Sequence, residues 1–180
     1  MEYLKIILLC ILSAIAYGIV QDQITARICI EYFTIGHPRI ILSEDPTLIA
    51  LLWGVIATWW VGLFLGIPVV LASRIGNWPK LDAKKLLRPI AILLGFVGIA
   101  SIIAGLIGNS LAIAKVVWLL EPLASRVPKE KHVYFLTDLW AHCASYGAGF
   151  IGGIILVFYI IYRRYKERRL KNTANQRIVL

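Results

Sequence analysis

Side chains that could do chemistry gather in the polar connections of an otherwise apolar chain. Asp22, Glu31 and His37 lie in one such stretch, and Asp138 and His142 lie much later, beside another apolar run. Asp138 and His142 are four residues apart, so in a helix they lie one above the other on a single face. Carboxylates and imidazoles of this kind can bind a divalent metal ion or transfer protons.

The same residues also have a purely structural interpretation. Asp138 would stabilise the start of a helix and hydrogen-bond to His142, and His142 would hold the preceding polar connection in place. One Asp-x-x-x-His pair is a much weaker metal signal than His-Glu-x-x-His, so we favour the structural interpretation over a metal site. The candidate polar or metal-binding cluster consists of Asp22, Glu31, His37, Asp138 and His142.

The remaining reactive side chains give weaker signals. Cys29 and Cys143 fall on the same side of the expected membrane, where an oxidising compartment would permit a disulfide between them. Ser145 follows His142 by three residues on a helix, which gives adjacency without a nucleophile elbow or an oxyanion hole. Glycine patterns typical of nucleotide binding are absent, because the glycines lie inside apolar runs.

Composition decides the class of protein. Of the 180 residues, 59% are apolar and 16% are charged, against about 45–50% and 25% in soluble domains. A chain this short cannot bury so much apolar surface in a core surrounded by water. The composition excludes a soluble enzyme, a secreted disulfide scaffold and a disordered protein, and it indicates a multi-pass membrane protein.

Four apolar runs are long enough to cross a bilayer as helices, which need about 17–25 residues each. We therefore predict an all-α membrane protein, a four-transmembrane-helix bundle with a small extracytoplasmic cap, forming a single integral membrane domain over residues 1–180. The expected spans are 3–20, 47–73, 89–114 and 137–162, the outer loops 21–46 and 115–136, and the basic cytoplasmic tail 163–180.

The basic residues predict the orientation. With four spans, thirteen of the nineteen Lys and Arg residues lie on the side that holds both termini. The positive-inside rule then places both termini in the cytoplasm. The tail beginning at Arg163 is expected to attract anionic lipid headgroups and not nucleic acid, because it directly follows a span. A cleavable signal peptide over residues 1–16 is an alternative, and it would leave the orientation of the rest unchanged.

Local signals predict where elements begin and bend. Asp45 and Pro46 are typical of the N-cap and first position of a helix, and Thr137 suits the N-cap of the last span, with Asp138 in its first turn. Pro68 predicts a kink near the cytoplasmic end of the second span. The alternation of residues 24–32 has the period of a strand, and we expect it to lie in the cap.

Small residues predict how the helices pack, because close backbone approach replaces the hydrophobic effect in lipid. The third and fourth spans both carry such residues near one stripe, so we expect these two spans to pair. A homo-oligomer or another membrane protein could use the same stripe. The expected packing residues are Gly98, Gly105, Ala141, Ser145, Gly149 and Gly153.

Three segments carry a resemblance to other proteins. Residues 17–38, with the sequence YGIVQDQITARICIEYFTIGHP, resemble a motif in a group of uncharacterised bacterial multi-pass membrane proteins. Residues 53–62 and 138–142 are similar to further parts of that motif. The resemblance implies a bacterial four-span protein of the cytoplasmic (inner) membrane. It carries over no activity and no site residue.

These observations favour a non-catalytic function, a binding or scaffold protein that holds a partner or a small ligand at its outer face. One alternative is a metal-dependent membrane enzyme that uses Asp22, His37, Asp138 and His142, with a divalent metal as its cofactor. Another is a small proton-coupled transporter that uses His142. A transporter would require acids or broken helices at mid-membrane in several spans, and charged residues there are almost absent.

Overall fold

The chain folds into a bundle of helices. The computed structural model describes the backbone of residues 1–179 and the side chains of residues 1–173. Helix accounts for 80% of the chain, and the described part contains no strand. The elements in order are α1 (Glu2–Ile28), α2 (Glu31–Thr34), α3 (Pro46–Ile56), α4 (Trp59–Arg74), α5 (Ala83–Ile113), α6 (Leu123–Arg126), the 3₁₀ turn η1 (Lys129–Lys131) and α7 (His132–Val179).

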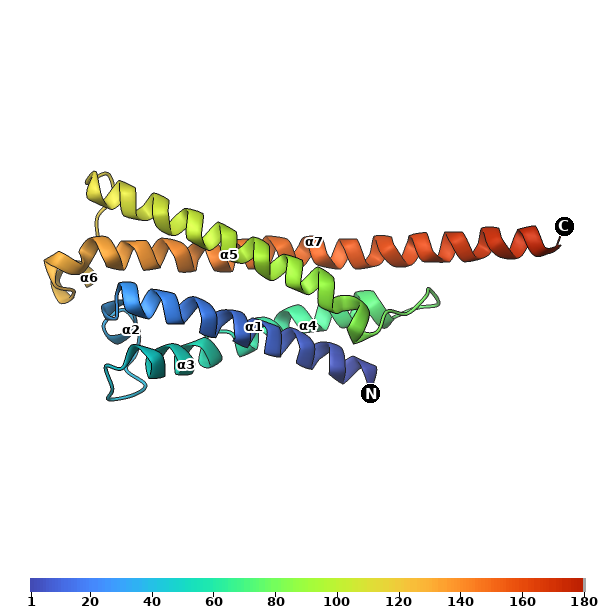
Figure 1. Cartoon of the computed structure of the whole chain (residues 1–180), viewed down its shortest axis with the longest axis horizontal. Coiled ribbons are helices and arrows are strands. Elements are labelled where there is room, and N and C mark those ends of the chain that lie inside the picture. The colour runs from blue at the N-terminus through green and yellow to red at the C-terminus, as the bar shows by residue number, and fades with distance from the viewer. Residues whose placement is uncertain (180) are drawn as a thin grey trace.

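Four helical segments are long and apolar enough to cross a membrane, as predicted. They are Glu2–Ile28, Pro46–Arg74, Ala83–Ile113 and Lys129–Thr173. Short elements α2, α6 and η1 gather at one end of the bundle, which we call the capped end. The opposite end, which we call the basic end, holds the N-terminus and the 75–82 loop, and α7 projects beyond it (Figure 1).

The second apolar segment is two helices and not one. Asp45 caps α3 as predicted, with its Oδ1 accepting hydrogen bonds from the backbone N–H of Thr47 at 2.7 Å and of Leu48 at 3.2 Å. The helix is interrupted at residues 57–58, where the Thr58 hydroxyl donates to the Gly54 carbonyl. Pro68, where a kink was predicted, lies inside α4, which continues through it. The Thr58 hydroxyl competes with a backbone N–H for the Gly54 carbonyl, and this competition accounts for the interruption at residues 57–58.

The strand predicted over residues 24–32 is wrong. Helix α1 continues to Ile28, and the chain turns at residues 29–30 before it enters α2. Ile24 and Ile28, one helical turn apart, are exposed on the outside of the bundle, whereas Thr25 and Ala26 are buried. The alternating residues therefore do not share one face, because they are divided between α1 and α2. A helix is favoured because it satisfies every backbone group internally, which a lone strand cannot do.

Helix α1 packs against α3 and α4 with its backbone almost in contact. A Cβ added at Gly54 would lie 2.6 Å from the Ile19 backbone, and one added at Gly62 would lie 2.5 Å from Ile11 Cα. Real Cβ atoms do not approach other atoms so closely, so these positions require glycine. This interface was not predicted, since the expected packing residues all belong to the third and fourth spans.

Helices α5 and α7 also lie against each other along much of their length. A Cβ at Gly105 would lie 3.4 Å from the Ala141 Cβ, and Gly108 lies under the Trp140 ring. The other expected packing glycines have different neighbours. Gly153 faces Leu65 of α4, Gly98 faces the Tyr17 ring of α1, and Gly149 meets no described atom within 4 Å.

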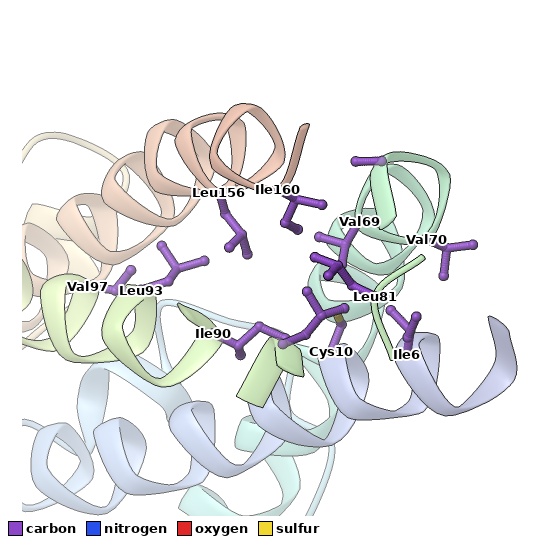
Figure 2. Close-up of a cluster of buried hydrophobic side chains, with 12 residues drawn as sticks. Ile6, Cys10, Val69, Val70, Leu81, Ile90, Leu93, Val97, Leu156 and Ile160 are labelled. Carbon is purple, nitrogen blue, oxygen red and sulfur yellow. The ribbon is translucent and has the colours of Figure 1, made fainter. Parts of the chain in front are cut away.

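Two clusters of buried apolar side chains fill the bundle. The cluster toward the basic end draws on α1, α4, α5 and α7, and its side chains point toward one another (Figure 2). The second cluster lies at the capped end around Phe33, Ile49 and Phe135. The polar side chains described below lie in α1 and α7 between these two clusters.

Arg164 holds the basic end together. Its guanidinium donates to backbone carbonyls at the end of α4 and in the following loop, Ala72, Ile75 (2.8 Å), Trp78 (3.3 Å) and Pro79 (2.8 Å). Arg164 is only 4% exposed. This residue belongs to the stretch predicted to be the basic cytoplasmic tail, and in the structure it caps the end of α4.

We expect Arg164→Ala to destabilise the protein by about 2–4 kcal/mol, because several carbonyls lose a charged donor at once. Thermal unfolding of the purified protein in detergent measures the effect. Lys166→Ala is the matched control, since Lys166 is exposed on the same helix. An equal loss in both variants would show that the helix tolerates no substitution there and would contradict the capping role.

Candidate functional site

Six buried polar residues come from the facing sides of α1 and α7. On α1 the inward positions are Gln21, Asp22 and Thr25, and on α7 they are Asp138, His142 and Ser145. Apolar residues next to this group, such as Val20 and Ile24 of α1, are exposed, so polar side chains are buried inside the bundle at this level. This is the reverse of a soluble helix, and it is what a helix surrounded by lipid would be expected to do.

Asp22 and His142 form a buried pair. The His142 Nε2 lies 3.1 Å from Asp22 Oδ1, and the two residues are 9% and 5% exposed. The other ring nitrogen, Nδ1, lies 3.0 Å from the backbone carbonyl of Asp138. A carbonyl can only accept, so Nδ1 carries a proton. The second hydrogen bond then holds one further proton, shared between the imidazole and the Asp22 carboxyl.

Asp138 is the unusual member of the group. It is 0% exposed, and neither carboxyl oxygen has a hydrogen-bond partner among the described residues. Burying such a group without a partner costs several kcal/mol. Only the backbone carbonyl of Asp138, and not its side chain, meets His142.

The predicted start of the last span is wrong. Helix α7 begins at His132, so Thr137 and Asp138 lie inside the helix and not at its N-cap and first turn. The Thr137 hydroxyl donates to the Val133 carbonyl at 2.9 Å and accepts from the Asn109 side chain at 2.9 Å. Stabilisation of a helix start therefore does not explain Asp138, which removes the simplest structural account of this residue.

Aromatic rings cover the pair from the capped end. The Tyr32 ring centroid lies 4.6 Å from that of His142, and the Phe33 centroid lies 5.9 Å from it. His37 packs on the far side of Tyr32 at 4.8 Å, and its Nδ1 lies 2.8 Å from the Tyr32 carbonyl. Burial raises the pKa of the Tyr32 phenol above its ordinary value. His37 thus supports the aromatic cover and does not reach the carboxyls directly.

Glu31 and the two cysteines lie outside the polar group. Glu31 pairs with Lys131 at 3.6 Å and accepts a hydrogen bond from Cys29 Sγ at 3.4 Å. Burial, with this hydrogen bond, raises the pKa of the Cys29 thiol to about 12, so it stays protonated. Cys29 is buried, Cys143 is exposed, and both are free thiols. The structure therefore gives no support to a disulfide between them.

A second polar group continues from the pair into the bundle. The Ser145 hydroxyl donates to Gln21 Oε1 at 2.7 Å, and the Tyr17 hydroxyl lies 2.9 Å from Ser145 Oγ and also donates to Gln21. Sequence reasoning missed this group, although the four-residue spacing of Tyr17 and Gln21 was a usable signal. Tyr17 packs against the apolar cluster of the basic end, and the buried Ser101 of α5 lies next to the Tyr17 hydroxyl.

The cluster is filled by its own side chains. A crevice of about 10 Å³ lies at the capped end between Phe33, Ile49 and Trp53. Among residues 1–173, no group of three or more His, Cys, Asp or Glu side chains is placed to hold a metal ion. The two unpartnered Asp138 oxygens are able to accept a hydrogen bond or to face a cation.

Comparison of the chain with protein-family models, curated protein sequences and solved structures finds no match. A function can therefore be inferred only from the geometry of the polar cluster itself.

Proposed function

We propose that the chain is an integral membrane binding or scaffold protein that holds a partner or a small ligand at its capped end. The observation that carries this proposal is Asp138, a fully buried carboxyl without a described partner beside the Asp22–His142 pair. Buried ionisable groups in membrane helices are functional candidates by default. A hydrogen-bond donor or a cationic group of the bound molecule would satisfy the Asp138 oxygens.

The distribution of charge supports a location for this protein. Basic residues are concentrated at the basic end, where Arg74, Lys84 and Lys85 border the 75–82 loop and α7 continues into its arginine-rich part. The positive-inside rule favours a cytoplasmic basic end. The protein would then lie in a bacterial cytoplasmic membrane with both termini in the cytoplasm. The capped end would face the opposite side of the membrane, where an extracytoplasmic partner could reach it.

The two alternative functions have less support. A metal-dependent enzyme needs a set of ligands, and the described side chains supply only Asp22 and His142 in direct contact. A proton-coupled transporter needs a polar route through the bundle. Toward the basic end, Tyr17 packs against a cluster of aliphatic residues such as Val97 and Leu156.

Photo-crosslinking tests the proposed function. A photoreactive amino acid is placed at Leu42, which is 92% exposed in the capped-end loop, and for comparison at Leu170 near the basic end. We expect a specific adduct in membranes from the Leu42 position only. Asp138→Asn should reduce its yield about tenfold or more, since a hydrogen bond to a charged group contributes about 1.5–3 kcal/mol.

Asp138→Asn separates binding from folding. The carboxyl has no described partner to lose, so we expect the melting temperature to change by only a few degrees. An unchanged adduct in Asp138→Asn, or no adduct at Leu42, would contradict the proposal. Elemental analysis of the same purified protein tests the enzyme alternative: a stoichiometric metal that is lost in His142→Ala would favour a metal site instead.

A further inference from the structure

A groove at the basic end lies outside the polar cluster and outside any role assigned above. It has a volume of about 600 Å³ and runs between the first turns of α1 and of α5. This size is within the range of about 300–1,000 Å³ that is typical of ligand sites. Its walls are formed by Glu2, Lys5, Leu8, Leu9, Leu12, Asp82, Ala83, Lys84 and Leu87.

The groove is divided along its length into a charged part and an apolar part. Lys5, Leu8 and Leu12 follow one another on a single face of α1, and Lys84 and Leu87 do so on α5. In both helices the lysine is at the start and the leucines lie further along. The charged part is therefore at the end of the bundle, and the leucines line the part that runs toward its middle.

The acidic side chains of the groove are already engaged within the protein. Glu2 pairs with Lys5 at 2.8 Å and accepts from the Ala83 backbone N–H at 3.3 Å. Asp82 caps α5 by accepting from the Lys85 N–H at 2.9 Å. Lys84 has no ion pair within the described residues, and Lys5 keeps more than half of its side chain exposed. The positive end of the α5 dipole adds to these lysines.

We propose that this groove binds a diacyl phospholipid, with the phosphate between Lys5 and Lys84 and an acyl chain along Leu8, Leu12 and Leu87. A phospholipid has the same order of parts as the groove, a charged group at the water interface and an apolar chain directed into the bilayer. Each lysine near a membrane surface contributes about 1 kcal/mol toward an anionic group. The inference rests on the membrane location proposed above, but it does not involve the capped end.

Native mass spectrometry of the purified full-length protein tests this proposal with dioleoylphosphatidylglycerol as the probe. Two comparison probes are dioleoylglycerol, which lacks the phosphate, and inorganic phosphate, which lacks the acyl chains. We expect one phosphatidylglycerol to remain bound, and both comparison probes to bind at least tenfold more weakly. Equal binding of dioleoylglycerol would overturn the role of the lysines, and equal binding of inorganic phosphate would overturn the role of the leucines.

Variants locate the bound lipid. The double variant Lys5→Ala/Lys84→Ala should weaken phosphatidylglycerol binding roughly ten- to thirtyfold. Lys80→Ala, a basic substitution in the neighbouring loop that is not part of the groove wall, should leave it within twofold. Leu87→Trp fills the apolar part without altering a charge and should also weaken binding. An equal loss in Lys80→Ala, or full binding in Leu87→Trp, would overturn the proposal.

Failure of this proposal is distinguishable from failure of the proposed function. Loss of lipid binding at the groove leaves the Leu42 adduct unaffected, because the two sites lie at opposite ends of the bundle (Figure 1).

Discussion

Replacing His142 with alanine should lower the free energy of unfolding by about 3–5 kcal/mol. The substitution removes one partner of a buried pair and leaves the Asp22 carboxyl buried alone, which costs more than the pair itself contributes. It also removes the ring against which Tyr32 and Phe33 pack at 4.6 and 5.9 Å. Thermal unfolding in detergent, or unfolding by added denaturing detergent, measures the change.

A double variant identifies the cause of that loss. If an unpaired Asp22 carboxyl is responsible, adding Asp22→Asn to His142→Ala should recover part of the stability, so that the double variant is more stable than His142→Ala alone. Cys143→Ala is the control, because it alters the adjacent but exposed residue. If the second substitution instead lowers stability further, the contact between the two side chains is not what holds the helices together.

The fold was predictable where a single residue or a long run carries the information. Composition and run length predicted four apolar helices, and Asp45 with Pro46 predicted the start of α3, because a cap depends only on its immediate neighbours. The strand predicted over residues 24–32 was wrong because a period of two over so short a segment also fits the end of one helix, a turn and the start of another. In the structure this part of the chain is the end of α1, where Ile24 and Ile28 are exposed and Thr25 and Ala26 are buried.

The site was only partly predictable for a different reason. Sequence spacing placed Asp138 and His142 on one face of a helix, but their side chains do not meet each other. Asp22 and His142 are 120 positions apart, and their contact depends on how α1 packs on α7. Glu31 was among the candidates for the same cluster, yet it forms an ion pair with Lys131 instead. Helix packing determines which titratable groups come into contact, and a local sequence pattern does not contain this information.

The second prediction with a large effect concerns that packing. We expect Gly62→Leu to destabilise the protein by about 3 kcal/mol or more, because a Cβ at this position would lie 2.5 Å from Ile11 Cα and 2.7 Å from the Cys10 carbonyl. Both neighbouring atoms belong to the backbone, so no side chain can move aside, and α1 would have to separate from α4. The shift would also displace Asp22 along the same helix and weaken its bond to His142.

Gly95→Leu is the matched control for this prediction. Gly95 lies inside α5, and a Cβ there meets no described atom within 4 Å, so the same change in side chain should alter stability by no more than about 0.5 kcal/mol. Leucine also has a higher helix propensity than glycine, and this difference raises the stability of both variants. A large loss at Gly62 alone would therefore measure the close approach of α1 and α4. Equal losses at the two positions would show that the bundle depends on glycine for backbone flexibility and not for packing.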